Sequence, residues 1–339
     1  SIFFIIFSAH SLYNYWSFSA HAWDLGIYDQ QTWLFGHFKP QFNTVRGMNL
    51  LSDHFGLILF PIGLIYLIYP HAETLLIVQA TLVVLSAYPL WIIAKHYLKS
   101  NLFGLAIVFV YLSSWGIQSA IDFDFHLATI AVFFYAYFIL FMWQKKWLWA
   151  GLLAILSMIT KEDMPIYIAF AMLGFLTIEI FNPDKENRRK TIIIQSVFFL
   201  FSLLFFLLID WLMTHINPIG RSNYFSFSSF GSSYFEILKN IFSQPVGFAQ
   251  KLFKQFYENP IKKKAFLVFM NGFSWLPVFA PQTYFAIIPF FLIKFASDRS
   301  ALWGLSGQYA VVGMFILSMA AIYAVKNILH KYENFRKYI

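Results

Sequence analysis

Side chains that could do chemistry gather in three segments that lie far apart in this sequence. The segments are Trp23–Gln30, which is followed by Asp53 and His54, then Asp122–His126, and finally Lys161–Asp163. Carboxylates serve as general bases or as ligands for divalent cations, imidazole does both, and lysine binds phosphate oxygens. These residue types suit an acid–base or phosphate-binding site, provided that the fold brings the three segments together.

Asp24 differs from the other carboxylates because Trp23 precedes it and Leu25-Gly26-Ile27 follows it. A carboxylate that is partly removed from water tends to have a perturbed pKa and a functional role. We therefore consider Asp24 as a catalytic residue. The alternative, which suits Asp53 and Asp163 better, is a solvated carboxylate that caps the end of a helix.

The pair Asp124 and His126 has two interpretations. In an extended loop both side chains point the same way and could hold a divalent cation such as Mg²⁺ or Mn²⁺. A turn that caps a helix beginning at Leu127 explains the same residues. Lys161 and Glu162 also have two interpretations. They form either a turn whose charges cancel, or a binding site in which the glutamate holds the lysine for contact with a phosphate oxygen.

The composition indicates a membrane protein. The chain has 339 residues, of which 59% are hydrophobic and 12% are charged, with 43 Phe, 19 Tyr and 11 Trp. Soluble domains are about 45–50% apolar and about 25% charged, so a soluble enzyme is excluded. A disordered chain and, without any Cys, a disulfide scaffold are excluded too. Basic cytoplasmic loops explain the net charge of +8 better than binding to nucleic acid does.

Apolar runs of about 20 residues cross a membrane as helices. The runs in this chain lack the alternation of barrel strands, so we predict an all-α, polytopic bundle of about ten transmembrane helices. The clearest predicted spans are Thr74–Ile93, Leu102–Gln118, Leu127–Trp143, Met164–Phe181, Ile192–Met213 and Tyr309–Val325, with shorter ones at Trp147–Thr160, Ala265–Ala280 and Thr283–Phe295. Ser1–Phe7 has the pattern of a helix end and no Met precedes it, so we expect a truncated N-terminus.

Basic residues in short loops orient this bundle. They form four clusters, at Lys95 and Lys99, at Lys145 and Lys146, at residues 185–190, and at residues 326–337. Helix parity puts all four on one side, which the positive-inside rule makes cytoplasmic, provided that Phe55–Tyr69 lies in the interface instead of crossing. We therefore expect a cell-membrane protein with both termini in the cytoplasm and the polar segments at the outer face.

The single transmembrane domain, residues 1–339, is expected to carry two long outer loops. The first, residues 18–73, contains interfacial helices. The second, residues 214–264, contains an amphipathic segment at Glu236–Tyr257 that should lie on the outer membrane surface. Lys262–Lys264 end this loop and run against the charge rule, which is weak for long loops. The candidate substrate-binding residues in these loops and in the third polar segment are Tyr28, Asp29, Gln30, Arg46, Asp53, His54, Lys161, Glu162 and Arg221.

Common enzyme and transporter signatures are missing from the sequence. There is no P-loop, H-E-x-x-H, G-x-S-x-G or dinucleotide fingerprint. The predicted spans carry little charge, with Glu179 and Asp210 near helix ends, which argues against an ion or proton relay.

Several short motifs occur in an order that resembles one membrane family. They are Trp23–Gln30, Asp53-His54-Phe55, Tyr66–Pro70, Thr74–Ala80, Asp124-Phe125-His126 and Lys161-Glu162-Asp163. Over almost the whole chain they resemble DUF2079, a family of predicted membrane proteins. That family is similar to the GT-C group of integral membrane glycosyltransferases, which includes protein O-mannosyltransferases and the lipid A aminoarabinose transferase.

The resemblance implies a GT-C-like layout, in which an acidic residue follows the first span and interfacial helices precede the second. By position this residue is Asp24, which the resemblance makes the catalytic base. It also implies a polyprenyl-phosphate-linked sugar as donor and an active site at the outer face. Two features depart from the pattern, because Asp24 is followed by Leu25 instead of a second acidic residue, and the large outer C-terminal domain of some members is missing.

We therefore expect a hexosyl- or pentosyltransferase that moves a sugar from a polyprenyl-phosphate donor to an acceptor at the outer membrane surface. Asp24 would deprotonate the acceptor hydroxyl, and Lys161, Arg46, Arg221 or a divalent metal would stabilise the phosphate leaving group. The expected partners are the lipid-linked donor, membrane lipid and an acceptor of unknown identity, without nucleic acid. The alternative is a non-catalytic membrane protein, such as a lipid or solute carrier or an assembly factor, whose polar loops only cap helices.

Overall fold

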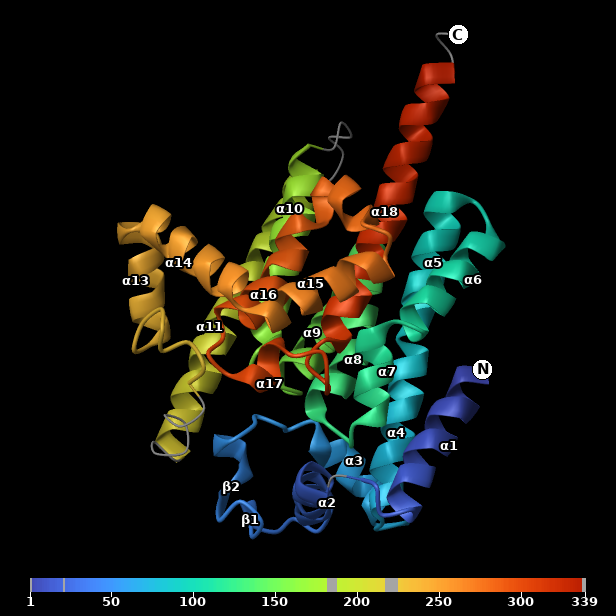
Figure 1. Ribbon diagram of the computed structural model, residues 1–339. Coiled ribbons are helices and arrows are strands. Elements are labelled where there is room, and N and C mark those ends of the chain that lie inside the picture. The colour runs from blue at the N-terminus through green and yellow to red at the C-terminus, as the bar shows by residue number, and fades with distance from the viewer. Residues whose placement is uncertain (1, 21, 182–187, 217–224, 337–339) are drawn as a thin grey trace.

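A computed structural model describes residues 2–20, 22–181, 188–216 and 225–336 (Figure 1). Within these residues the fold is helical, apart from one short antiparallel pair of strands. The elements are α1 (Ile2–Trp16), α2 (Ala22–Gly36), β1 (Phe42–Asn43), β2 (Met48–Asn49), η1 (Leu50–Ser52), α3 (Leu59–Tyr66), α4 (Ala72–Leu85), α5 (Ala87–Leu98), α6 (Asn101–Leu112), α7 (Trp115–Asp122), α8 (Leu127–Trp143), α9 (Trp147–Met158), α10 (Met164–Ile180), α11 (Arg188–Ile216), α13 (Tyr234–Ser243), α14 (Pro245–Glu258), α15 (Pro260–Gly272), η2 (Leu276–Phe279), η3 (Pro281–Thr283), α16 (Tyr284–Ala296), α17 (Ser300–Trp303) and α18 (Val311–Arg336).

Among the described residues, three helical stretches are long and apolar enough to cross a membrane. They are Ala72–Leu98, which joins α4 and α5, then Arg188–Ile216 and Val311–Tyr332. The pair α6 and α7 forms a fourth candidate, bent by 48°, and α8, α9, α10 and the η3–α16 stretch are apolar but shorter. The all-α fold with span-length apolar helices is confirmed. The number of about ten spans stays a prediction.

Two predicted spans are not single helices. The run Ala265–Ala280 breaks where α15 ends at Gly272, because Ser274 and Trp275 adopt positive φ angles of 50° and 58°. Such angles cannot continue a right-handed helix, and hydrophobic composition gives no sign of them. The run Leu102–Gln118 is interrupted between α6 and α7. The continuous-span prediction is therefore wrong for the first run, and the second is a bent pair.

Two long helices occupy opposite environments in the bundle. The candidate span of α18 is 78% buried and packs against α5, α8 and α16, so α18 is the central helix. The span of α11 is only 17% buried and exposes Leu200, Leu204 and Leu207. A helix that shows leucine to its surroundings suits contact with lipid. We therefore expect α11 to line the lipid-facing edge of the bundle.

Helices α2 and α3 meet through two glycines. A Cβ atom built at Gly63 would lie 2.6 Å from the backbone nitrogen of Gly36, and one built at Gly36 would collide with the carbonyl group of Gly63. Only glycine allows two backbones to approach so closely. With eight residues, α3 reaches about 12 Å at 1.5 Å per residue and is too short to cross a membrane. This agrees with the prediction that Phe55–Tyr69 does not form a span.

The predicted amphipathic segment forms two helices, of which α13 lies at the periphery of the fold and α14 leads back to α15 and α16 (Figure 1). Pro245 lies at the first turn of α14, so the interruption between α13 and α14 falls where the sequence predicts it. Neither helix has a buried residue, and Phe235, Phe242 and Phe253 are largely exposed. The placement of these helices on the outer membrane surface remains a prediction.

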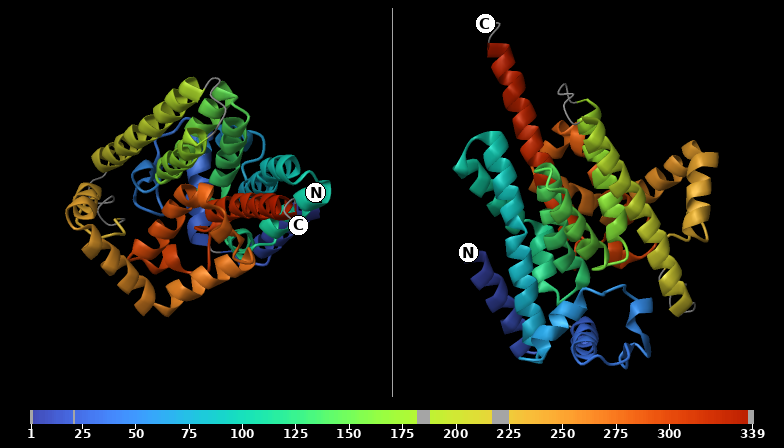
Figure 2. Two further views of the ribbon diagram at one scale, coloured as in Figure 1. Left: turned by 90° about the horizontal axis from the view of Figure 1, so that it is seen from above. Right: turned by 180° about the vertical axis from the view of Figure 1, so that it is seen from behind.

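Three of the predicted basic clusters lie at the end of the fold opposite to α2 and α3. In Figure 1 and in the rear view of Figure 2, α2, α3 and the strands form one end, while the α5–α6 connection, the end of α10 and the end of α18 form the other. At this second end Lys326 lies over the ring of Tyr97, 4.3 Å from its centroid. Lys145 Nζ is 3.7 Å from Glu179 Oε1 at the end of α10. The clusters at Lys95, Lys145 and Lys326 therefore share one end of the fold, whereas residues 185–187 of the fourth cluster lie outside the described residues.

Candidate functional site

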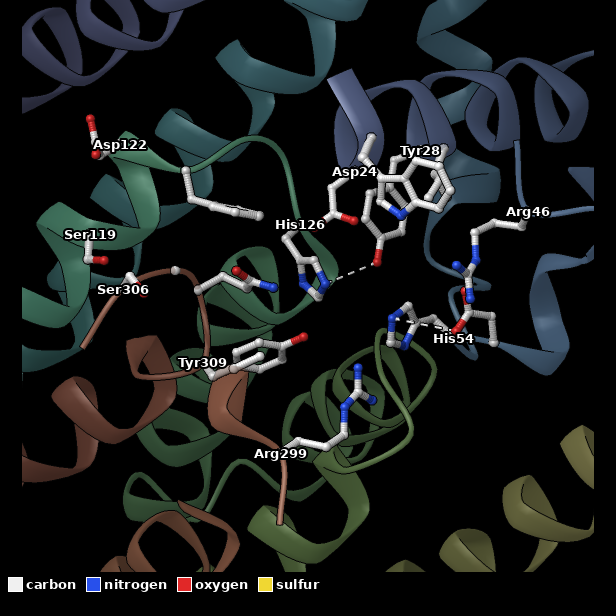
Figure 3. A pocket seen from close by; sticks show the side chains of 17 residues that line it. Asp24, Tyr28, Arg46, His54, Ser119, Asp122, His126, Arg299, Ser306 and Tyr309 are labelled. Carbon is white, nitrogen blue, oxygen red and sulfur yellow. Dashed lines mark hydrogen bonds and ion pairs between the residues drawn. The ribbon is translucent and has the colours of Figure 1, made fainter. Parts of the chain in front are cut away.

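A cavity of about 490 Å³ lies between α2, the end of α7, the start of α8 and the loop that precedes α18 (Figure 3). It is lined by Trp23, Asp24, Ile27, Tyr28, Arg46, Asp53, His54, Ser119, Asp122, Phe123, His126, Arg299, Ala301, Ser306, Gly307, Gln308 and Tyr309. Two of the three polar segments predicted from sequence thus contribute walls directly. The fold joins them to a fourth segment, residues 299–309.

One face of α2 forms the wall that carries the candidate base. Asp24 lies in the first turn of this helix, and Ile27 and Tyr28 follow at the spacings that share a helix face. Tyr28 is buried, whereas Asp24 is partly exposed. In Figure 3 Asp24 lies beside Tyr28 at the edge of the open space. Asp24 can therefore be reached by a molecule in the cavity.

Asp29 and Gln30 belong to other faces of α2 and do not line the cavity. Tyr66 donates a hydrogen bond from its hydroxyl to Asp29 Oδ1 at 2.7 Å, which ties α2 to α3. Gln30 Oε1 accepts from both the backbone nitrogen and the hydroxyl of Thr44, each at 3.0 Å. These two candidate substrate-binding residues therefore fasten the scaffold behind the cavity wall.

Arg46 reaches the cavity from the turn between β1 and β2. The backbone nitrogen of Arg46 donates to Asn43 Oδ1 at 3.0 Å, and the Asn43 amide donates to the carbonyl of Ile27 at 2.9 Å. Arg46 Nε donates to Asp53 Oδ2 at 2.9 Å, and its guanidinium lies 5.8 Å from the ring centroid of Trp23. The turn thus presents a cation to the same space as Asp24.

His54 and the third polar segment form a charge network at the base of the cavity. His54 Nδ1 donates to Glu162 Oε1 at 3.1 Å, and Lys161 Nζ lies 3.2 Å from that oxygen and 3.0 Å from Asp163 Oδ2. Burial lowers the pKa of His54, but Glu162 and Asp53 outweigh it and raise that pKa above its ordinary value. Burial likewise opposes the charge of Lys161, but Asp163 and Glu162 raise its pKa. Lys161 is therefore a buried cation beneath the cavity, without lining it.

His126 ends the loop before α8 and uses both of its ring nitrogens. Nδ1 accepts a hydrogen bond from the backbone nitrogen of Ala128 at 3.0 Å, and Nε2 lies 3.2 Å from the hydroxyl of Tyr28. Gln79 fixes the same turn, since its amide donates to the carbonyl of Asp124 and accepts from the backbone nitrogen of His126. Burial, followed by the nearby charges of His54 and Lys161, holds the pKa of His126 well below its ordinary value.

These contacts do not suit the metal site considered from sequence. Both nitrogens of His126 are engaged within the protein, and Asp124 does not line the cavity. In the part of the chain that the structure describes, no three His, Cys, Asp or Glu side chains group closely enough to hold a metal ion. The helix-capping interpretation of His126 agrees with its contact to Ala128.

Arg299 enters the cavity from a segment that two buried lysines hold in place. Lys262 Nζ donates to the carbonyls of Phe295 at 2.7 Å and Ser297 at 3.1 Å, and Lys294 Nζ donates to the carbonyl of Leu302 at 2.9 Å. Lys262 and Lys294 are 4% and 2% exposed. The positive-inside rule does not predict Lys262 in an outer loop. Its contacts with main-chain carbonyls inside the protein explain this position.

The wall formed by residues 299–309 was not predicted from the sequence. Arg299, Gln308 and Tyr309 line the cavity, yet Tyr309 was predicted as the first residue of a span and Arg299 was not singled out. A signal was present, because residues 297–308 interrupt the apolar runs with a polar stretch that contains Asp298. Of the predicted candidates, Arg221 lies outside the described residues.

The fold and the cavity together define a helical membrane protein with a polar, ionisable pocket near one end of its bundle. The family model of DUF2079, described as a predicted membrane protein, matches residues 14–339, and the chain belongs to this family. Searches of curated proteins and of solved structures found no match.

Proposed function

We propose that this protein transfers a sugar from a polyprenyl-phosphate-linked donor to a hydroxyl of an acceptor. The observation that carries the proposal is the shared cavity of Asp24, Arg46 and Arg299. One carboxylate and two arginines are the groups that such a reaction requires, namely a general base and cations for a phosphate leaving group. The resemblance to the GT-C group, in which an acidic residue follows the first span, would give the same role to Asp24.

The proposed reaction needs one proton acceptor and no general acid. Asp24 takes the proton of the acceptor hydroxyl while the hydroxyl oxygen forms a bond to the anomeric carbon of the sugar. The bond between that carbon and the phosphate oxygen breaks, and its electron pair leaves with the polyprenyl phosphate. Arg46 and Arg299 stabilise the added negative charge on the phosphate. Arg46 is held by Asp53, which fixes its guanidinium before the ligand arrives.

His54 and the buried ion pair of Lys161 and Glu162 support the phosphate end of the site. The raised pKa of His54 favours a cation next to the cavity, and Glu162 holds both His54 and Lys161. Preorganised charges of this kind stabilise developing charge without reorganising during the reaction. We assign His54 to phosphate binding and Lys161 with Glu162 to holding His54 in place.

We further propose that the cavity faces the outer side of the cell membrane and that both termini are cytoplasmic. The basic clusters near Lys95, Lys145 and Lys326 support this orientation, because they lie at the end of the bundle opposite to α2 and α3. The donor lipid would lie with its tail among apolar helices and its phosphate at the cavity.

The direct test uses purified protein in liposomes with a radiolabelled polyprenyl-phosphate sugar and a panel of hydroxyl acceptors. Cleavage of the sugar–phosphate bond with release of free polyprenyl phosphate is the expected result. A protein that moves the intact donor across the bilayer without cleaving it is a carrier, and that outcome contradicts the proposal. Protein denatured by heat before reconstitution provides the background rate.

A further inference from the structure

Tyr28 is a buried residue of α2, and its hydroxyl points into the cavity between His126 and His54 (Figure 3). Tyr28 is 1% exposed, and its ring makes an edge contact with Phe125 at a centroid distance of 5.6 Å. The ring therefore has little freedom to turn. Among the described residues, His126 is the hydrogen-bond partner of this hydroxyl, at 3.2 Å from Nε2.

The tautomer of His126 follows from its contact with Ala128. A backbone N–H can only donate, so His126 Nδ1, which faces the nitrogen of Ala128 at 3.0 Å, carries no proton. An imidazole without a proton on Nδ1 carries its proton on Nε2. In the contact between the two side chains, His126 Nε2 therefore donates and the Tyr28 oxygen accepts.

This assignment leaves the proton of the Tyr28 hydroxyl for an acceptor in the cavity. Burial, followed by the charge of Asp24, raises the pKa of Tyr28 well above its ordinary value, so the hydroxyl keeps its proton at neutral pH. A buried hydroxyl proton without an acceptor is costly, which favours a ligand oxygen at this point. The cavity is lined by three carboxylates, Asp24, Asp53 and Asp122, and by the guanidinium groups of Arg46 and Arg299. An oxyanion of the ligand would pair with these two arginines and accept the Tyr28 proton.

We propose that the Tyr28 hydroxyl donates a hydrogen bond to a phosphate oxygen of the bound ligand, and that His126 is a positioning residue that fixes the direction of this bond. That the ligand is linked to a lipid rests on the proposed function. It requires only that the cavity binds a phosphate. Tyr28 supplies a neutral donor from the α2 wall, where Asp24 would disfavour a phosphate held by charge alone.

Binding of farnesyl phosphate to the purified protein in detergent tests the contact. Tyr28→Phe removes one oxygen and keeps the ring, and it should weaken binding about 10- to 100-fold, the range for a hydrogen bond to a charged group. Tyr135→Phe is the matched control, because the hydroxyl of Tyr135 is buried, has no hydrogen-bond partner among the residues that the structure describes, and lies outside the cavity. It should bind as the wild type does. Wild-type affinity in Tyr28→Phe overturns the proposal.

Binding of farnesol and of inorganic phosphate tests which part of the ligand contacts Tyr28. Farnesol lacks the phosphate, so the Tyr28→Phe change should leave its binding unaltered, and an equal loss for farnesol contradicts a phosphate contact. Inorganic phosphate should compete with farnesyl phosphate in the wild type, and Tyr28→Phe should weaken this competition by a similar factor. Stronger binding of farnesyl phosphate than of inorganic phosphate identifies a lipid headgroup as the source, and the reverse order identifies free phosphate.

The role of His126 is tested by a double-mutant cycle. His126→Asn can still accept from the nitrogen of Ala128, but it removes the ring donor to Tyr28. Alone it should weaken farnesyl phosphate binding by less than Tyr28→Phe does. The double variant should bind no more weakly than Tyr28→Phe alone, because His126 acts through the missing hydroxyl. Independent, additive losses contradict the positioning role, and a merely structural defect would produce such additivity.

These measurements contain no sugar and no transfer step. If sugar transfer fails but phosphate binding depends on Tyr28, the proposed function falls and the phosphate contact stands. If sugar transfer depends on Asp24 but phosphate binding does not depend on Tyr28, the proposed function stands and the phosphate contact falls.

Discussion

His54 Nδ1 donates a hydrogen bond to Glu162 Oε1 at 3.1 Å, across 108 positions of sequence. Glu162 also accepts from the backbone nitrogen of Phe55 at 3.4 Å, so one carboxylate fixes both the side chain and the main chain of the first polar loop. This contact connects the turn between α9 and α10 to the cavity. The third polar segment thus acts on the site through His54, without lining the cavity.

Phosphate binding should depend on pH through His54. Its pKa is raised above 6.5, so the cation is fully present below pH 6.5 and is lost as the pH rises through the higher value of the folded protein. Affinity for farnesyl phosphate should fall across that rise. His126 stays neutral there because its pKa is lowered.

His54→Gln should flatten this pH profile, whereas His215→Gln, which changes an exposed histidine on α11, should leave it intact. The affinity is measured from pH 5.5 to pH 9 in about half-unit steps. A profile that is unchanged in His54→Gln would show that another group titrates.

The proposed orientation can be read by labelling single cysteines, because the natural chain has none. Val45→Cys lies at the exposed turn between β1 and β2, and Lys146→Cys lies in the exposed turn between α8 and α9. In intact cells a membrane-impermeant maleimide should label the cysteine at position 45 and not the one at position 146. Labelling of both, or the opposite pattern, contradicts the proposed topology.

Packing of α2 on α3 should be sensitive to a single methyl group. Gly36→Ala places a Cβ against the carbonyl of Gly63, and overpacking of this kind costs about 1–3 kcal/mol. Gly26→Ala is the matched control in the same helix, because its Cβ would meet nothing within 4 Å. The apparent unfolding temperature in detergent should fall for the first variant and stay equal or rise for the second. Equal temperatures for both would contradict the close contact.

The lysine contacts to the segment that carries Arg299 should matter more for binding than for stability. Lys262→Met removes two hydrogen bonds to main-chain carbonyls, but it also removes a buried charge. Affinity for farnesyl phosphate should therefore fall about 10-fold, a change of about 1.4 kcal/mol, while the unfolding temperature changes little. Lys264→Met, two residues further along α15 and exposed, should change neither quantity. Unaltered affinity in Lys262→Met would show that the segment is held by other contacts.

The sequence predicted the helices correctly where an apolar pattern repeats along one helix. The apolar runs predicted the helices, and the break at Pro245 separates α13 from α14 as expected. The same logic failed at Ser274 and Trp275, where positive φ angles end a hydrophobic run without any glycine or proline at those positions.

The site was predicted only in part because its walls come from contacts between distant segments. Residue type identified Asp24, Arg46 and His54 as candidates, and all three line the cavity. Asp29 was a candidate as well, but it turns toward Tyr66 on another face of α2, and residue type alone does not show this. Arg299 was missed because its segment is placed by Lys262 and Lys294, and such main-chain contacts leave no spacing pattern in the sequence.

The most direct test of the proposed reaction compares the wild type with Asp24→Asn for two quantities in the same preparation. One is the rate of sugar transfer from a radiolabelled polyprenyl-phosphate donor, and the other is the affinity for farnesyl phosphate. Loss of a general base lowers rates by about 10²–10⁴-fold. We predict a fall of that size in the transfer rate, with an affinity for farnesyl phosphate equal to or higher than that of the wild type, because Asp24 opposes the charge of a bound phosphate. A wild-type transfer rate in Asp24→Asn would contradict the assignment of Asp24 as the base.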